Sequence, residues 1–107
     1  MKRGRPKKPR KIENEPYIRR FSPRGQHGRP GYTDIAVDQY EALRLADFIG
    51  LSQKEAAASM GISQQTYSRI LKEARKALTE GVVLGHTIRI KDTEKPRRRA
   101  KKGQIQP

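Results

Sequence analysis

The chain has 107 residues and carries 25 Lys and Arg against 11 Asp and Glu, which gives a formal net charge of +14 at pH 7. Its hydrophobic content of 33% leaves room for one small domain, and the charge indicates a polyanionic partner. It has no cysteine, which excludes disulfides and thiolate metal sites, and no apolar run is long enough to span a membrane. We therefore expect a cytoplasmic protein without a membrane partner.

The positive charge is concentrated at the two ends of the chain. Residues 1–11 hold seven Lys and Arg and residues 95–107 hold six, with no acidic residue in either stretch, whereas residues 12–94 carry a net charge of +1. Runs of like charge do not fold by themselves and usually serve as interaction arms. The expected organisation is a basic disordered arm over residues 1–16, a folded domain over residues 17–90 and a basic disordered tail over residues 91–107.

The basic arm contains Arg3-Gly4-Arg5-Pro6, which resembles the core of an AT-hook. In such a hook the glycine lets the backbone lie deep in the minor groove of A·T-rich DNA, while the two arginines extend along the groove floor. The alternative is a generic basic tail that touches phosphates, because short motifs in low-complexity stretches also arise by chance. Both interpretations predict contact between this segment and DNA.

Two short stretches show the alternation of a β-strand. Residues 17–21 form the first and residues 86–90 the second, and several Pro and Gly residues after the first mark a loop. An isolated strand is unstable, so the second stretch needs a partner, either the first stretch or a second copy of itself in a dimer. The chain has no cysteine that could bind a metal ion together with His27 or His86, so we expect no metal site.

A helix is predicted over about residues 38–48. Asp38 and Glu41 have the spacing of a capping box at its start, and Gly50 supplies its end. Its apolar residues occupy more than one face, so we expect it to be largely buried against the helices that follow.

The centre of the chain predicts two further helices joined by a tight turn. Ser52 and Glu55 form a capping box for the first of them, and Gly61 suits the left-handed position at which that helix ends. Ser63 then serves as the N-cap of the last helix. The local pattern thus places the start of one helix, the turn after it and the start of the next helix within twelve residues.

The spacing around this turn is that of a DNA-binding helix-turn-helix. The small residue Ala57 lies four positions before Gly61, where the two helices come closest, and Ile62 follows the glycine and fills the corner. An ordinary helical hairpin is the alternative. A hairpin, however, does not require these residues together at these positions, followed by a basic helix.

The last helix is predicted over about residues 64–80. Apolar residues recur along it at the spacing of a stripe that faces the core, namely Tyr67, Ile70, Leu71, Ala74 and Leu78. Polar and basic residues occupy the opposite side, which is therefore the candidate DNA-reading surface.

Specific base contacts are expected from the first part of this helix. Gln64 and Gln65 can each offer an amide to adenine, and Arg69 can bind guanine in a bidentate manner. Hydroxyl groups and lysines there suit phosphates and water-bridged contacts. The expected major-groove residues are Ser63, Gln64, Gln65, Thr66, Ser68, Arg69 and Lys72, and those expected on phosphates or in the minor groove are Arg3, Gly4, Arg5, Pro6 and Lys76. The alternative for each is the solvated face of an amphipathic helix.

An enzyme is not expected. The sequence has no clustered Ser, His and Asp set, no P-loop and no obvious carboxylate pair, and its domain is too small to enclose a large pocket. We therefore expect neither a catalytic site nor a cofactor.

Residues 37–90 resemble an uncharacterised family of bacterial and archaeal proteins with a domain of unknown function, labelled only as predicted DNA-binding and similar in turn to region four of the primary sigma factors. The segments that carry the resemblance are Tyr40-Glu41-Ala42-Leu43-Arg44-Leu45, Gly50-Leu51-Ser52-Gln53, Met60-Gly61-Ile62-Ser63, Arg69-Ile70 and Ala74-Arg75-Lys76. The resemblance implies a three-helix DNA-binding fold and a prokaryotic regulator. It also implies that Gln64, Gln65, Ser68 and Arg69 occupy groove-reading positions. Many relatives have cysteines in the N-terminal segment, and their absence here argues against a metal-linked role.

The expected fold is all-α, a three-helix helix-turn-helix domain similar to sigma region four, with short flanking strands and disordered basic tails. The expected function is sequence-specific binding of double-stranded DNA by a transcriptional regulator located at the nucleoid. One alternative is a non-specific nucleic-acid or nucleoid-associated protein driven by its tails, and another is a protein-interaction module of the transcription machinery. The partners to consider are double-stranded DNA, a second copy of the chain and RNA polymerase; half-sites for a dimer would lie about 34 Å apart or a multiple of it.

Overall fold

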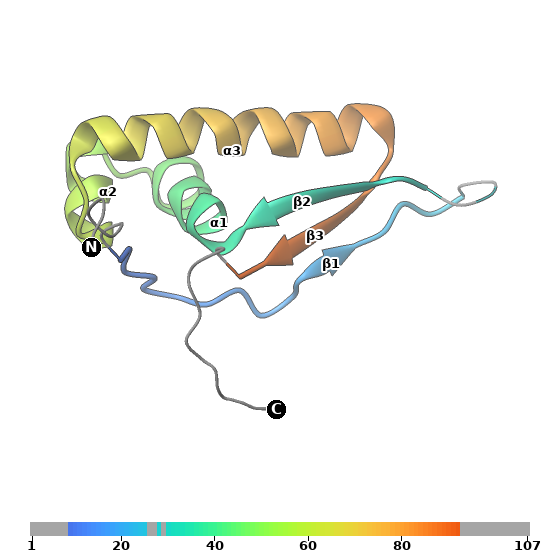
Figure 1. Ribbon diagram of the computed structural model, residues 1–107, viewed down its shortest axis with the longest axis horizontal. Helices are drawn as coiled ribbons and strands as arrows, with labels where there is room; N and C mark the ends of the chain where they lie inside the picture. The colour runs from blue at the N-terminus through green and yellow to red at the C-terminus, as the bar shows by residue number, and fades with distance from the viewer. Residues whose placement is uncertain (1–8, 26–27, 29, 93–107) are drawn as a thin grey trace, which may run out of the picture.

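The computed structural model describes residues 9–25, 28 and 30–92. Helix α3 runs along one side of the molecule, with the other helices packed near its N-terminal half and a small sheet along its C-terminal half (Figure 1). The elements in chain order are β1 (Arg20–Phe21), β2 (Tyr32–Ala36), α1 (Val37–Leu43), the π-helix η1 (Arg44–Ile49), α2 (Gln53–Met60), α3 (Gln64–Leu84) and β3 (Thr87–Lys91). The three expected helices and the short flanking strands are present, but the strands form a sheet, so the fold is mixed α/β and not all-α as expected.

The sheet has three strands in the order β1-β3-β2. β3 pairs antiparallel with β1, with Arg20 opposite Arg89 and Phe21 opposite Ile88, which confirms the pairing of the two alternating stretches within one chain. β2 pairs in parallel with β3 and was not predicted. β2 directly precedes the first helix and β3 follows the last one. Both strands lie against α3, where they pair with each other.

The local structure around the turn between α2 and α3 is as predicted. Ser52 accepts a 3.1 Å hydrogen bond from the backbone nitrogen of Glu55, whose side chain accepts a 2.9 Å bond from the Ser52 nitrogen. Gly61 ends α2 with φ +69°, a left-handed conformation that glycine adopts at little cost. Ser63 caps α3 by accepting a 3.0 Å bond from the Thr66 nitrogen. We call residues 52–84, which comprise α2, the turn and α3, the α2–α3 unit.

The first helix begins differently from the prediction. Ala36 is its N-cap, and the Ala36 nitrogen donates a 3.0 Å bond to the side chain of Gln39. The expected capping box of Asp38 and Glu41 is absent, because Asp38 pairs with Arg10 and the Glu41 carboxylate turns into the protein. Asp38 and Glu41 have the spacing of a capping box, but their carboxylates instead pair with Arg10 and Arg44.

The first helix also changes its winding. After Leu43 it continues as the π-helix η1, in which the Gly50 nitrogen donates to the Leu45 carbonyl at 3.1 Å. Gly50 ends it with φ +92°, as predicted. This wider winding buries Leu45 and leaves Phe48 exposed. Apolar residues on more than one face of the predicted helix are thus divided between core and solvent.

Helix α3 is longer than predicted and ends at Gly85, with φ +67°, rather than at Gly81. Gly81 is buried inside the helix, where a Cβ atom would lie 2.8 Å from Cγ1 of Ile88 on β3. Glycine is therefore needed at this position for the close approach of helix and sheet, and not to end the helix.

The core lies between α3 and the helices near its N-terminal half. Tyr67, Leu71 and Ala74 of the predicted stripe are buried, whereas Leu78 is 38% exposed because the helices α1 and α2 do not cover that turn. The central cluster consists of Ala42, Leu45, Ala56, Ala57, Met60, Tyr67 and Leu71. In the part of the chain that the structure describes, no helix combines the length and the apolar character needed to cross a membrane.

The boundaries of the folded part differ from those expected. Residues 9–16, assigned to a disordered arm, lie against the domain: the Lys11 nitrogen donates to the Met60 carbonyl at 2.9 Å, and Ile12 packs against the core. Lys91, assigned to the C-terminal tail, belongs to β3. The rest of the two basic tails, residues 1–8 and 93–107, lies outside the described residues.

Candidate nucleic-acid interface

The side of α3 that faces solvent carries the residues expected to read bases. The side chains of Gln64, Gln65, Arg69 and Lys72 are exposed and make no hydrogen bond or ion pair with any described residue. With about 3.6 residues per turn, Gln65 and Arg69, each two positions from the buried Tyr67, lie nearly opposite the core. The structure thus places these side chains together on one free surface.

Three of the expected contact residues are engaged within the protein. The Ser63 hydroxyl donates to Oγ1 of Thr66 at 3.0 Å and accepts from the Thr66 nitrogen, so both hydroxyls form the cap of α3. The Ser68 hydroxyl donates to the side-chain oxygen of Gln53 on α2. These hydroxyls hold the start of α3 against α2, which differs from the free polar contacts expected from the sequence.

The start of α2 adds two residues that the sequence reasoning missed. Gln53 lies beside Ser68, and the next residue, Lys54, is exposed without a partner among the described residues. Backbone N–H groups in the first turn of a helix favour anions. Because the capping box at Ser52 had already located this turn, Gln53 and Lys54 could have been found from the sequence.

Lys11 also lies at this surface. Its aliphatic chain covers the turn, since a Cβ atom at residue 61 would lie 3.6 Å from Cγ of Lys11. The Lys11 backbone is held to the last residue of α2, Met60. Nothing in the composition of the N-terminal segment indicates this position, because the contact joins residues about fifty positions apart.

Several acidic side chains pair with basic side chains that are not among those expected to read bases. Arg75 binds Asp47 through two hydrogen bonds of 2.8 and 3.1 Å, which lower the pKa of that carboxyl group. Asp34 binds Arg89 and lies 3.7 Å from Lys91 in the sheet, and hydrogen bonding to Arg89 lowers the pKa of Asp34. Four exposed basic side chains of the α2–α3 unit pair with no described acid, namely Lys54, Arg69, Lys72 and Lys76.

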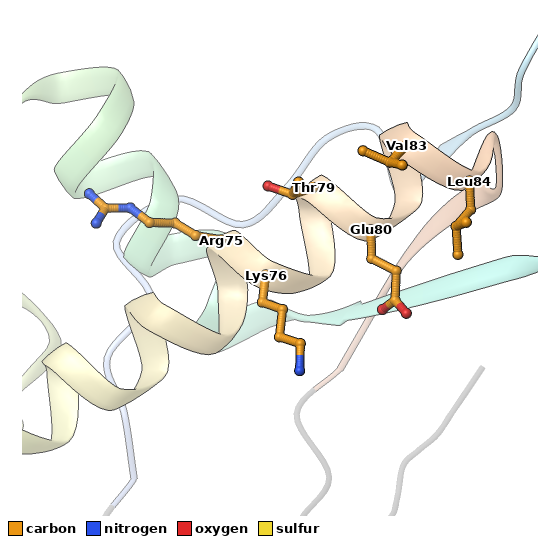
Figure 2. A pocket seen from close by; sticks show the side chains of 6 residues that line it. All are labelled: Arg75, Lys76, Thr79, Glu80, Val83 and Leu84. Atoms are coloured by element: carbon orange, nitrogen blue, oxygen red, sulfur yellow. The ribbon is translucent and has the colours of Figure 1, made fainter.

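A shallow groove follows the outer side of α3 beyond the residues expected to read bases. Arg75, Thr79 and Val83 line one side of it, and Lys76, Glu80 and Leu84 line the other (Figure 2). The apolar end of the helix is exposed, with Val82 at 68%, Val83 at 73% and Leu84 at 57%. The groove therefore ends among exposed apolar side chains.

Among the residues that the structure describes, His86 takes part in no metal site. Nδ1 of His86 lies 2.8 Å from the Thr33 hydroxyl, which accounts for one of its ring nitrogens. No three His, Cys, Asp or Glu side chains within the described ranges are arranged to hold a metal ion. His27 and the segment Arg3-Gly4-Arg5-Pro6 lie outside those ranges.

Comparison with known proteins identifies the family. The family model described as Protein of unknown function DUF134 matches residues 1–98. The chain belongs to the DUF134 family. A relative named UPF0251 protein from Syntrophobacter fumaroxidans is 47% identical over 85 residues, which cover 75% of this chain and 54% of the relative.

Further DUF134 relatives occur in archaea and in other bacteria. A UPF0251 protein from Methanococcus maripaludis is 38% identical over 84% of this chain and 70% of its own length. One from Vibrio vulnificus is 45% identical over 85% of this chain and 96% of its own length. The chain spans about half the length of the Syntrophobacter fumaroxidans relative, 54%, and of a UPF0251 protein from Prosthecochloris aestuarii, 56%. No solved structure matches the chain.

Proposed function

We propose that this DUF134 protein binds double-stranded DNA at specific sequences and acts as a transcriptional regulator. The observation that carries the proposal is the free surface of the α2–α3 unit, on which Gln65, Arg69 and Lys72 stand exposed opposite the core. Two capped helices joined at a left-handed glycine, with the second presenting such residues, suit insertion into the major groove. A structural likeness to region four of sigma factors forms part of this proposal.

The side chains divide into two roles in the proposed complex. Gln64, Gln65 and Arg69 contact base edges, where one good bidentate pair contributes about 1–3 kcal/mol of discrimination. Lys54 and Lys72 contact phosphates and set the orientation of the protein on the duplex. Arg75 is excluded from both roles, since Asp47 already holds its guanidinium group.

The main alternative is non-specific binding of nucleic acid by the basic tails. Tail-driven binding weakens steeply as salt rises and selects no sequence, because it depends on the number of counterions released from phosphates. The basic side chains of the α2–α3 unit would then contribute only through the formal net charge of +14. A protein-interaction module of the transcription machinery is a further alternative, in which DNA binding is absent.

Selection from a randomised duplex pool tests the proposal. The full-length protein is compared at two salt concentrations with a full-length variant in which the Lys and Arg of residues 2–8 and 95–102 are replaced by Gln. Enrichment of one motif by both proteins supports the proposal. Loss of all binding in the variant, with no motif enriched by either protein, contradicts it and favours the tail-driven alternative.

We also propose a second copy of the chain as the partner of the groove on α3. Lys76 and Glu80 stand one helical turn apart on one side of it, so two antiparallel copies can pair Lys76 of each with Glu80 of the other (Figure 2). Sedimentation velocity tests this: Glu80→Lys should dissociate the dimer, and Lys76→Glu combined with Glu80→Lys should restore it. A monomeric wild-type protein contradicts the proposal and leaves Lys76 available for phosphate.

A further inference from the structure

We infer that the face of the sheet turned away from α3 binds single-stranded nucleic acid, with bases stacked on Tyr32 and phosphates bound by Arg20 and Lys91. We call this face the outer sheet face; it carries Arg20, Tyr32, Asp34, Arg89 and Lys91. It is a second site, separate from the α2–α3 unit, and the inference does not depend on the proposed function.

The alternation of β2 defines the two faces of the sheet. Tyr32 and Asp34 are exposed, whereas Thr33 between them is buried. A Cβ atom at Gly81 of α3 would lie 3.4 Å from Cβ of Thr33, so the Thr33 side of the sheet faces the helix. Successive side chains of a strand point to opposite faces. Tyr32 and Asp34 therefore lie on the face turned away from α3.

Two arginines lie over the Tyr32 ring on this face. The guanidinium carbon of Arg89 is 4.0 Å from the ring centroid, and that of Arg20 is 5.9 Å from it. Arg89 is held in place by hydrogen bonds of 2.8 and 3.3 Å to Asp34, yet Tyr32 stays 51% exposed. Unpaired bases stack on aromatic rings and on the planes of arginine side chains. Arg89 and Tyr32 thus form a fixed stack that a base can extend.

The cations of the outer sheet face outnumber its carboxylates. Asp34 serves both Arg89 and Lys91, whose amino group lies 3.7 Å from it. Arg20 is exposed and forms no ion pair with a described acid, although it lies directly opposite Arg89 in the strand register. Like charges in opposite positions destabilise a pair of strands. A phosphate group bound at Arg20 offsets this repulsion, which favours a polyanion as the partner.

The outer sheet face and the surface proposed for duplex DNA lie on opposite sides of the molecule. Lys72 precedes Gly81 by about two and a half helical turns, so these two residues are on opposite sides of α3. The sheet packs on the Gly81 side of the helix (Figure 1). One straight duplex therefore cannot contact both surfaces, and the outer sheet face is available to a separate strand.

A single tryptophan tests the stacking. The chain has no tryptophan, so Tyr32→Trp in the full-length protein reports on this site alone and keeps an aromatic ring beside the arginines. Phe48→Trp is the matched control, because Phe48 is 84% exposed on η1, outside the sheet, and both variants carry the same basic tails. Each variant, its fold verified by circular dichroism, is titrated with oligouridylate, oligothymidylate and a DNA duplex, all about twelve nucleotides long.

The single strands should quench the tryptophan fluorescence of Tyr32→Trp and leave that of Phe48→Trp nearly unchanged. The stronger quencher of the two identifies the strand as RNA or DNA. The duplex should quench neither variant, because its bases are already stacked on each other. Equal quenching in both variants, none in either, or equal quenching by the duplex overturns the inference. Quenching by poly-glutamate as strong as that by the single strands also overturns it and assigns the face to an acidic polypeptide.

The phosphate contact has its own test. In the Tyr32→Trp protein, Arg20→Gln should reduce the slope of log affinity against log salt, measured by quenching, by about 0.7. Arg24→Gln is the matched control, since Arg24 is exposed in the connection between β1 and β2 and removes the same charge. Equal slopes for Arg20→Gln and Arg24→Gln, with unchanged circular dichroism, contradict a phosphate contact at Arg20.

Discussion

The hydroxyl group of Tyr67 donates a 2.7 Å hydrogen bond to the backbone carbonyl oxygen of Ala42. Tyr67 is 0% exposed, and burial raises the pKa of its hydroxyl, which therefore stays protonated as a donor. The bond ties α3 to α1 at the centre of the core. It consequently fixes the rotation of α3 about its axis, which determines that Gln65 and Arg69 face solvent.

Tyr67→Phe removes this bond without changing the shape of the core. We expect a loss of about 1 kcal/mol in the free energy of unfolding, because a buried acceptor loses its partner. Urea denaturation followed by circular dichroism measures it. Tyr40→Phe is the matched control, since the Tyr40 hydroxyl bonds to no described residue. Equal stabilities of the two variants would show that the Tyr67 bond contributes nothing.

Gly81→Ala tests the close contact between α3 and β3. Alanine favours a helix by about 1 kcal/mol over glycine, but its Cβ would lie 2.8 Å from Cγ1 of Ile88. We expect the substitution to lower the free energy of unfolding by about 1–2 kcal/mol in the wild type. In an Ile88→Ala background, which removes the obstructing atoms, it should raise that energy instead. The same sign in both backgrounds would argue against a steric role for Ile88.

The ion pair between Arg75 and Asp47 should make stability depend on acid pH. The pKa of Asp47 lies below its ordinary value in the folded protein, first because of its hydrogen bonds to Arg75. Its stabilising contribution is therefore complete above the unfolded-state pKa and is lost as pH falls through the folded-state pKa. Both side chains are about half exposed, so we expect less than about 1 kcal/mol.

A double-mutant cycle of Asp47→Asn and Arg75→Gln isolates this pair. Thermal or urea unfolding from about pH 6 to about pH 2 should show a coupling energy that disappears at the acid end. A coupling energy that stays constant over this range would mean that the carboxylate charge is not what stabilises the pair.

The predictions that succeeded rest on interactions between residues close in sequence. Ser52 with Glu55, Ser63 with Thr66 and the left-handed Gly61 each need at most four neighbouring residues, so the pattern alone specifies them. The exposure of the polar side of α3 followed from the same periodicity. The length of α3 was underestimated because Gly81 resembles a helix end until the position of β3 is known.

The features that were missed depend on distant partners. β2 is only five residues long, follows a Pro- and Gly-rich stretch and pairs in parallel with β3, more than fifty residues later, so no local signal marks this pairing. Residues 9–16 have the composition of a disordered arm, but their donors find acceptors at Met60 and Glu41. The π-helix η1 likewise has no signal in the periodicity, which predicted one continuous helix up to about residue 48.

The most direct measurement of the central claim is the specificity ratio of the full-length protein, the dissociation constant for a scrambled duplex divided by that for the enriched duplex. It is measured for the wild type, for Arg69→Ala and for Arg75→Ala, the last being an arginine of the same helix already bound by Asp47. We predict that Arg69→Ala lowers the ratio about 5- to 150-fold and that Arg75→Ala leaves it nearly unchanged. A ratio that Arg69→Ala does not alter would contradict base reading by α3.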